Sequence, residues 1–517
     1  MKVQTLFWLA SLAAWAQRPD LHVIEVVDES TKRGVPLVEL CATSGACFLT
    51  DSAGLVALQE PSFWGQDVYF SIRGHGYEHA KDFFGDPGRS IRVTRGGSTR
   101  VTVTRVNIAE RLYRVTGEGI YRDSVIAGRK RGGRPLLNAN VTGLDTVMHT
   151  VYRGRLFWLF GDTNNLSASL GNLATTCARS LLPGKGGLDP EAGIDLAYFE
   201  GKGGFVKPMA AIPGPGMKWM FALMVVRDAA GVERLVARYD RMKSLEEAYD
   251  TGLAVFDDER QEFRPIVSFG TKPAIAPYGR PTRVSVDGKD YFYFSSPHPT
   301  PVVRVKAEWE AVQDLSRYEA LSCDSTGCGW GAGGKPERVR FVDVDSGKPV
   351  EAETGSVQWN EYRRRWVAIL QKNVGEVWYA EADTPAGPWA YAKRIVQHQN
   401  YTFYWPGQIA EFDTRGGRRI YFMGTYTQSF SGNPVKTPRY DYNQILYALS
   451  LDDPRMALPV AAYRVRGQAK TMVKEELDRL GLWKDVEAVS HYELGTRRLE
   501  NPDGRLMLDW GARASGR

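Results

Sequence analysis

The chain has 517 residues, 43% hydrophobic and 11% aromatic, which is enough for about two to four domains with hydrophobic cores. Its net charge of +6 is the small difference between 66 Lys and Arg and 60 Asp and Glu. The basic residues are scattered and form no stripe beside an aromatic platform, which excludes nucleic acid as the expected partner. The slight positive excess is compatible with an acidic or sulfated polysaccharide.

The first residues have the pattern of a signal peptide. Lys2 gives a short positive start, and the apolar run that follows it to Trp15 is shorter than the roughly 20 residues that span a bilayer. Ala14 and Ala16 place small residues at the two positions that signal peptidase reads. We therefore expect a signal peptide over residues 1–16 and a secreted or periplasmic protein. No later segment is long and apolar enough to predict a transmembrane segment.

Residues 20–106 read as short strands separated by turns. Within them, the sequence Thr-Asp-Ser-Ala-Gly at 50–54 precedes a strand, and Gly-Tyr-Glu follows at 76–78. This order resembles the carboxypeptidase regulatory-like, or transthyretin-like, β-sandwich. The resemblance implies an accessory domain with no catalytic role.

From residue 107 to 465 one unit recurs, a polar turn followed by an aromatic-rich strand of alternating character. Each unit takes about 70 residues, more than the 40–50 of short-loop propeller repeats, so the excess must lie in loops. A strand unit with two apolar faces cannot bury both alone, and radial stacking solves this most simply. We predict an all-β fold: a five-bladed β-propeller with an N-terminal β-sandwich and a short C-terminal helix. Two successive β-sandwiches are the alternative. The repeated strands cover residues 152–162, 231–239, 287–294, 360–370 and 416–424.

The last segment, 466–517, has a different pattern. Apolar residues recur at near-helical spacing over 469–480, and Gly481 is a suitable end for a helix. The polar stretch that follows, rich in Arg and Gly, predicts a loosely ordered tail.

Four of the five cysteines form two closely spaced pairs, Cys41 with Cys47 and Cys323 with Cys328. Each pair brackets a turn-like loop, so local disulfides can form in an oxidising compartment and leave Cys177 unpaired. Free buried thiols are the alternative. The spacing fits no zinc pattern, and no metal site is expected.

Two carboxylates are the sharpest chemical feature of the propeller segment. Asp145 falls at the start of the first unit's inner strand, and Asp162 falls at the end of the adjacent antiparallel strand, so both can reach one rim. Hydrolysis of a glycosidic bond needs one protonated and one ionised carboxyl group. For each aspartate the alternative role is a turn cap. The sequence contains no Gly-rich phosphate loop, no His-Glu-x-x-His and no Gly-x-Ser-x-Gly.

These features resemble the five-bladed propeller glycosidases, the arabinanase- and xylosidase-like enzymes that act on arabinan, xylan and related polymers. The aspartate pair, the segment 380–389 and the strand 443–447 carry the resemblance. It implies a base in the first blade and a general acid from another blade. Glu353, which precedes the fourth inner strand, is the acid candidate, and an exposed loop glutamate is its alternative role.

Other residues near the starts of inner strands are candidate substrate contacts. Tyr404 and Trp405 could stack on a sugar ring, and Arg280 could hold a hydroxyl pair or a carboxylate. Lys218 and His298 complete this set. Core packing is the alternative role for the aromatic residues.

The expected function is therefore a secreted glycoside hydrolase that acts on a polysaccharide or oligosaccharide through a carboxylate pair. One alternative is a non-catalytic carbohydrate-binding or cell-surface adhesion protein. Another is a polysaccharide lyase, in which Arg280, His298 and Tyr404 would matter more than the aspartates. No cofactor is expected, although a structural Ca²⁺ in the axial channel is left open. The sugar, its linkage and the oligomeric state are also open.

Overall fold

The computed structural model describes residues 20–129, 135–172, 175–295, 298–324, 327–336, 338–373, 375–437, 441–495, 497–500 and 512–514. The predicted signal peptide lies outside them. The chain divides into two compact units, the first comprising residues 1–104 and 121–136 and the second comprising 105–120 and 137–517. Among the described residues, no helix combines the length and apolarity that crossing a membrane would require.

The first unit contains two four-stranded sheets that enclose one core. Alternating residues of β1 and β5 point inward, and Ile24 and Phe70 are fully buried between the sheets. One sheet has the order β4 (Leu55–Leu58), β1 (His22–Asp28), β8 (Ser98–Arg105) and β6 (Tyr77–Glu78). The other has the order β3 (Cys47–Leu49), β2 (Glu39–Ala42), β5 (Asp67–Arg73) and β7 (Gly88–Arg92).

The chain returns to the first unit after leaving it, to form the short helix α1 (Arg122–Ile126). Two buried carboxylates hold this helix against the sheet. Asp51 accepts a hydrogen bond from the backbone N–H of Ser124 at 2.7 Å, and Asp123 accepts one from that of Ala57 at 3.0 Å. These long-range bonds explain why the unit does not end where its last predicted strand ends.

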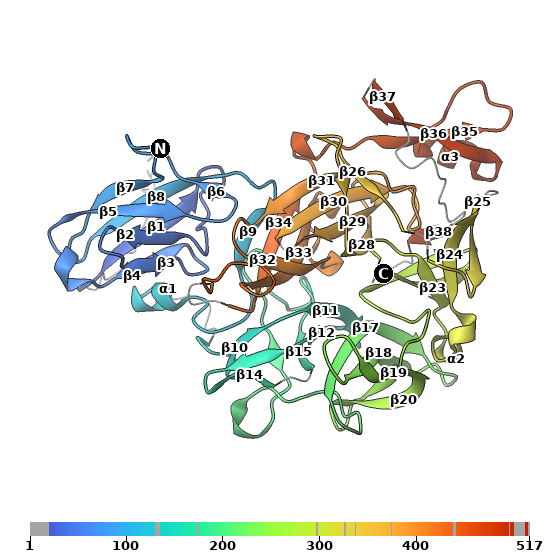
Figure 1. Ribbon diagram of the computed structural model, residues 1–517, viewed down its shortest axis with the longest axis horizontal. Helices are drawn as coiled ribbons and strands as arrows, with labels where there is room; N and C mark the ends of the chain where they lie inside the picture. Colours follow the sequence, from blue (N-terminus) through green and yellow to red (C-terminus); the bar gives the residue numbers. More distant parts are fainter. Residues whose placement is uncertain are drawn as a thin grey trace, which may run out of the picture. The chain divides into compact units, whose positions relative to one another are not determined.

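The second unit is built around five sheets of four or more strands among its described residues (Figure 1). In chain order, the first sheet contains β11 (Val147–Tyr152), β12 (Arg155–Phe160), β15 (Thr176–Ser180) and β16 (Ala197–Tyr198). The second contains β17 (Met217–Arg227), β18 (Glu233–Met242), β19 (Ala248–Asp257) and β20 (Glu262–Gly270). The third contains β21 (Pro281–Val286), β22 (Lys289–Phe294), β23 (Val303–Lys306), β24 (Glu319–Asp324) and β25 (Gly327–Ala332), with β38 (Ala512–Ala514) beside β21.

The last two sheets complete the set. The fourth contains β28 (Thr354–Asn360), β29 (Arg365–Lys372), β30 (Glu376–Ala382), β31 (Tyr391–Gln397), β26 (Phe341–Asp343) and β27 (Pro349–Val350). The fifth contains β32 (Thr402–Gln408), β33 (Arg419–Thr427), β34 (Asn443–Ser450) and β9 (Glu110–Arg114). The strand β9 comes from the N-terminal end of the unit and pairs with β34 from its C-terminal end.

The inner strands of these sheets form a ring. β11 contacts β17, β17 contacts β21, β21 contacts β28, β28 contacts β32, and β32 contacts β11. The hydrophobic cores lie between neighbouring sheets: Phe157 and Met220 share one core, Val284 and Trp366 a second, and Trp158 and Leu446 a third. A closed ring of five radially packed sheets is a five-bladed propeller, so the predicted fold class is confirmed.

Two smaller sheets and two further helices accompany the propeller. Their bounds are β10 (Val141–Leu144), β13 (Thr163–Asn165), β14 (Ala168–Asn172), β35 (Val460–Val465), β36 (Val486–Leu494), β37 (Arg497–Glu500), α2 (Trp309–Val312) and α3 (Lys474–Leu480). The predicted C-terminal helix is present but begins at Lys474, because the backbone of Met472 pairs with that of Tyr463 in both directions. The prediction of a loosely ordered tail is wrong for β36, whose Val489 and Tyr492 pack against Tyr463.

Both cysteine pairs form disulfides, Cys41 with Cys47 and Cys323 with Cys328. Cys177 is a free, buried thiol in the core between the first and second sheets.

Candidate active site

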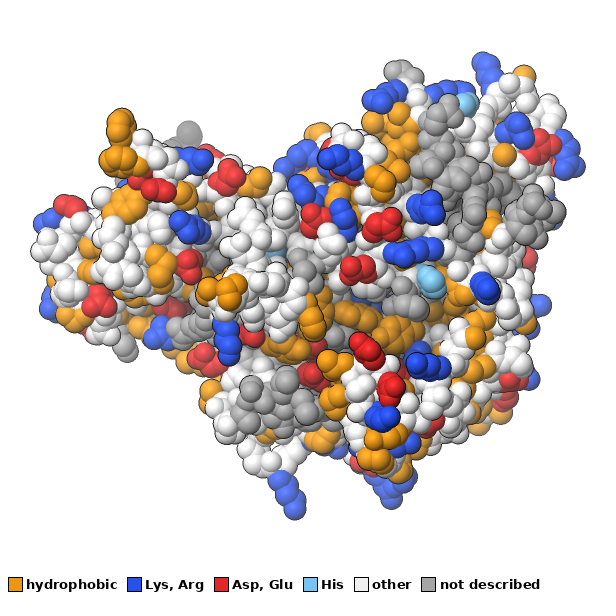
Figure 2. Space-filling model, viewed as in Figure 1, with side chains coloured by type: hydrophobic (Ala, Val, Ile, Leu, Met, Phe, Trp, Pro, Cys, Tyr) orange, Lys and Arg blue, Asp and Glu red, His pale blue; other side chains and the backbone are white. Residues whose placement is uncertain are grey.

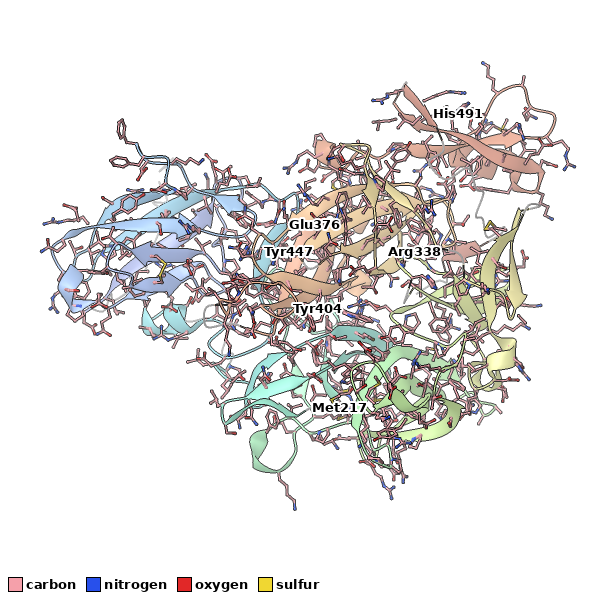
Figure 3. All side chains as sticks on the ribbon, in the orientation of Figure 1. Met217, Arg338, Glu376, Tyr404, Tyr447 and His491 are labelled. Carbon is pink, nitrogen blue, oxygen red and sulfur yellow. A yellow bond between two sulfur atoms is a disulfide. The ribbon has the colours of Figure 1, made fainter. Side chains whose placement is uncertain are left out.

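The inner strands begin at one end of the propeller, and we call the residues at that end the axial rim. Asp145 precedes β11, Trp219 lies near the start of β17, Arg280 precedes β21, and Tyr404 lies near the start of β32. Tyr404, labelled in Figure 3, lies where the fifth sheet faces the first. Side chains far apart in the sequence therefore meet at this rim.

The backbone holds the two aspartates side by side. The N–H of Asp145 donates to the carbonyl of Asp162 at 3.1 Å, and the N–H of Gly161 donates to the carbonyl of Asp145 at 3.0 Å. A side chain at position 161 would collide with Oδ1 of Asp145. A larger residue before Asp162 would therefore displace the carboxyl group of Asp145, which lies against the backbone there.

The carboxyl group of Asp145 is held mainly by aromatic hydroxyls. Its Oδ2 accepts a hydrogen bond of 2.6 Å from the hydroxyl of Tyr404, and the Tyr442 hydroxyl also hydrogen-bonds this carboxyl group. Its Oδ1 is out of contact with solvent and has no hydrogen-bond partner. Burial, followed by the charge of Asp162, raises the pKa of Asp145 to about 7, although the Tyr404 hydrogen bond opposes the rise.

Asp162 occupies a different environment. Its Oδ1 accepts a hydrogen bond of 3.3 Å from the indole N–H of Trp219. Burial raises the pKa of Asp162, and the Trp219 bond opposes this shift. Because the charge of Asp162 acts on Asp145, Asp162 ionises first. Between the pKa of Asp162 and that of Asp145 the pair therefore offers one ionised and one protonated carboxyl group, as acid and base roles require.

Trp405 follows Tyr404 at a β-bulge in β32, where the pairing with β33 shifts between Tyr404 and Gly407. Its φ of +50° is a strained conformation for a bulky residue. The Nη2 of Arg280 donates to its carbonyl at 2.6 Å, and its N–H donates to Oε1 of Gln371 at 2.8 Å. The half-buried ring stacks on Phe221 with centroids 5.8 Å apart.

Glu353 is connected to this bulge through Gln371. The Nε2 of Gln371 donates to Oε2 of Glu353 at 2.9 Å, while the Oε1 of the same amide binds Trp405. The side chain of Glu353 is exposed just before β28. The structure thus connects Glu353 to the axial rim through Gln371 and the backbone of Trp405.

The guanidinium of Arg280 makes hydrogen bonds to the backbone. It donates to the backbone carbonyls of Val147 at 2.7 Å, Trp405 at 2.6 Å and Pro406 at 3.3 Å. Its side chain is buried, and burial lowers the pKa of Arg280 to about 9. Arg280 therefore joins β21 to the starts of β11 and β32, where it fixes the bulge.

Lys218 and His298 occupy the margins of the rim. Lys218 is half-buried in β17, and its carbonyl accepts hydrogen bonds from Thr175. His298 lies in the loop after β22, which meets the start of β28 through the hydrogen bond from Ser295 to Gly355. Burial, and then the charge of Arg338, lowers the pKa of His298.

Four of the described residues in the left-handed region of backbone conformation lie at or near this rim. Thr146, Ala222, Trp405 and Tyr442 all have φ between +39° and +60°. Strained residues of this kind collect at functional sites, where the surrounding structure over-determines them. Sequence reasoning missed Tyr442 and Gln371, although Tyr442 directly precedes the strand 443–447 that was noted for its pattern.

The described residues of the rim include no group of three or more His, Cys, Asp or Glu side chains that lies close enough to share an ion. Among the described residues, Glu39, Cys41 and Cys47 of the first unit are the group close enough to share an ion. The two thiols are joined in a disulfide, which leaves Glu39 as the sole ligand of that group. A structural Ca²⁺ in the axial channel stays a proposal.

No family model matches the sequence, and no curated protein matches it. Solved structures with a similar fold include the GH43_1 enzyme from Xanthomonas citri in complex with xylose, at 13% identity and a TM-score of 0.35, covering 67% of this chain and 94% of that chain. An exo-β-1,3-galactanase from Phanerochaete chrysosporium is 8% identical with a TM-score of 0.34, covering 66% of this chain and 65% of that chain. An α-L-arabinofuranosidase from Fusarium graminearum is 12% identical with a TM-score of 0.33, covering 61% of this chain and 96% of that chain.

Proposed function

We propose that the protein is an exported glycoside hydrolase that uses Asp145 and Asp162 at the axial rim. The proposal rests on the unequal environments of the two carboxyl groups. Asp145 keeps its proton up to a pH of about 7, while Asp162 ionises first. Asp145 is then the proton donor to the leaving oxygen, and Asp162 carries the negative charge that a cationic, oxocarbenium-like transition state requires.

Neighbouring groups support a saccharide as the substrate. Trp219 and Trp405 are half-buried aromatic residues at the same rim, and an aromatic face suits the apolar face of a sugar ring. The predicted signal peptide is consistent with export to a place where polysaccharides occur. The sugar and its linkage are left to experiment.

The test is hydrolysis of a panel of polysaccharides by the wild-type protein and by Asp145→Asn and Asp162→Asn. Each substitution removes an acid or base, a role worth about 10²–10⁴ in rate, so each should lower turnover by at least 10². Asp452→Asn, at an exposed aspartate away from the rim, is the matched control and should retain full activity. Unchanged turnover in both rim variants would exclude the assignment.

A carbohydrate-binding protein without catalysis is the second candidate. One observation favours it: Oδ1 of Asp145 is out of contact with solvent and Oδ2 is occupied by Tyr404, so the carboxyl group faces its neighbours. This candidate predicts retention on a polysaccharide with no hydrolysis by the wild type. The lyase alternative has no comparable support, because the guanidinium of Arg280 is held by three backbone carbonyls.

A further inference from the structure

A cavity lies on the propeller, away from the axial rim. Its volume is about 830 Å³, within the range of about 300–1,000 Å³ that small-molecule sites occupy. The turns after β11 and β19, the start of β18 and the segment before β17 form its walls. The lining residues are Arg153, Ala211, Pro213, Arg234, Val255, Phe256, Asp257, Asp258, Glu259, Arg264 and Pro265.

Strand directions place this cavity on the opposite face of the propeller. β11 runs from Val147, beside Arg280 at the axial rim, to Tyr152, which is next to Arg153 in the cavity wall. Six residues of extended strand span about 17 Å. β18 begins beside the end of β17, and β19 ends beside the start of β20. Because β17 starts at the axial rim, the cavity residues of β18 and β19 also lie at the opposite face of the propeller. The cavity is therefore separate from the candidate active site.

Two carboxylates of the cavity pair with two of its arginines. Asp258 binds Arg153 at 3.1 Å and approaches Arg179 at 3.8 Å, and it also accepts the hydroxyl of Tyr152 at 2.7 Å. Arg264 approaches Asp257 at 3.8 Å.

The remaining arginine of the wall, Arg234, is paired at 2.8 Å with Asp228, which lies outside the cavity. The lining thus carries equal numbers of arginines and carboxylates, three of each. Figure 2 likewise shows charges of both signs interspersed on the face that it presents.

Apolar groups cover the rest of the wall. Pro213, Val255, Phe256 and Pro265 line it. A guanidinium has several donors and a carboxylate several lone pairs, so each group keeps bonding capacity beyond its ion pair. Fixed donors and acceptors without net charge, beside an apolar wall, suit a molecule that has hydroxyls on its edges and C–H groups on its faces.

We propose that this cavity binds a segment of a neutral polysaccharide, as a second site that anchors the chain remotely from the axial rim. A neutral ligand fits better than an acidic one, because each arginine of the wall has a carboxylate partner within 4.0 Å. The ligand class is a neutral oligosaccharide of pentoses or hexoses.

The proposal can be tested by affinity electrophoresis of the full chain in gels that contain arabinoxylan, arabinan, galactan or polygalacturonate. All variants carry Asp145→Asn so that a polymer stays intact, which separates this test from the question of hydrolysis. Arg264→Ala and Arg153→Ala remove exposed cavity groups with little risk to folding, because these side chains are about half exposed. Arg92→Ala removes an equally exposed arginine, paired with Asp67, from the first unit.

We expect at least one neutral polymer to retard the protein, with a dissociation constant that rises about fivefold or more in the cavity variants and is unchanged in Arg92→Ala. Retardation that is equal in all variants would overturn the proposal, as would the absence of retardation by every neutral polymer. Stronger retardation by polygalacturonate than by any neutral polymer would overturn the ligand class. Loss in Trp405→Ala together with full retention in the cavity variants would assign all binding to the axial rim.

Discussion

At the scale of single residues, the protonation of Asp145 depends on groups that act in opposite directions. Burial and the charge of Asp162 raise its pKa, while the hydroxyl of Tyr404 lowers it. If Asp145 donates a proton in the reaction, activity falls as the pH rises through this pKa. The pH at which activity falls, the high-pH limb of the pH profile, therefore depends on the hydrogen bond from Tyr404.

We expect Tyr404→Phe to move the high-pH limb of kcat/KM to higher pH, by about one unit, because the variant lacks the donor that stabilises the ionised form. The measurement is the pH profile of kcat/KM on a substrate that the wild type hydrolyses. Tyr249→Phe, at an exposed tyrosine, should leave the limb where it is. A limb that stays in place in Tyr404→Phe would show that Asp145 is not the group that titrates.

The same raised pKa has a consequence for stability. A carboxyl group whose folded-state pKa exceeds its unfolded value stabilises the fold below the unfolded pKa, near 4, and loses that contribution as the pH rises to about 7. Asp145→Asn removes the cost of burying the charge. Its melting temperature should therefore exceed that of the wild type at pH 8, corresponding to at most about 4 kcal/mol, with no such gain at pH 4. A gain of equal size at both pH values would contradict the assignment.

At the scale of elements, the bulge of β32 brings the aromatic residues of the fifth sheet to the axial rim. A bulge re-aims side chains and often lies beside an active site. Here it is fixed from two other sheets, by Gln371 of β29 and by Arg280 before β21. The conformation of Trp405 is thus a property of three blades together.

We expect Gln371→Leu to release this bulge, because the N–H of Trp405 loses its acceptor. An unpaired N–H in this environment costs about 1–3 kcal/mol, and the free energy of unfolding should fall by that amount. KM should rise more than kcat falls if Trp405 contacts the substrate. Gln313→Leu, at a glutamine bonded to the local backbone carbonyl of Trp309, serves as the control. An unchanged KM would remove Trp405 from the substrate contacts.

The hairpins could be predicted from the sequence because their signals are local. Tyr152 to Asp162 contains a polar turn and an alternating strand, and the structure forms there the turn that follows β11 and the strand β12. The site was predictable only in part. The adjacency of Asp145 and Asp162 follows from one hairpin, whereas the contact between Tyr404 and Asp145 joins residues 259 positions apart.

Other contacts of the site left no local signal. A positive φ at Tyr442 or Trp405 cannot be read from residue types that ordinarily avoid it. The hydrogen bonds from Arg280 to backbone carbonyls form because three blades approach one another there. The sequence shows only a basic residue before a strand. The sequence therefore predicts the sheets better than it predicts the orientation of the side chains between them.

At the scale of the whole molecule, the ring is closed by β9, the first strand of the propeller in the chain. Its Leu112 is fully buried in the core between the fifth and first sheets, and its Glu110 pairs with Arg419 at 2.7 Å. Arg114 also donates to Asn443 at 2.9 Å. Closure thus depends on apolar packing and on buried polar contacts within one sheet.

We expect Leu112→Ala to lower the free energy of unfolding by about 2–5 kcal/mol, the usual cost of deleting a large buried side chain. Thermal or urea unfolding, followed by tryptophan fluorescence, provides the measurement. Leu480→Ala, at an exposed leucine of α3, should cost far less. Equal stability of the two variants would show that β9 contributes little to closure.

The origin of β9 also has a consequence for biosynthesis. Of the strands of the fifth sheet, β9 is synthesised first and its partner β34 last. Their residues Arg114 and Asn443 are separated by 329 positions. On the ribosome, β9 therefore has no partner strand until nearly the whole propeller has emerged. Such late, non-local pairing slows folding and leaves strand edges open to other chains. A helper that shields nascent β-strands should therefore raise the yield of this protein more than that of one whose last sheet is made from consecutive strands.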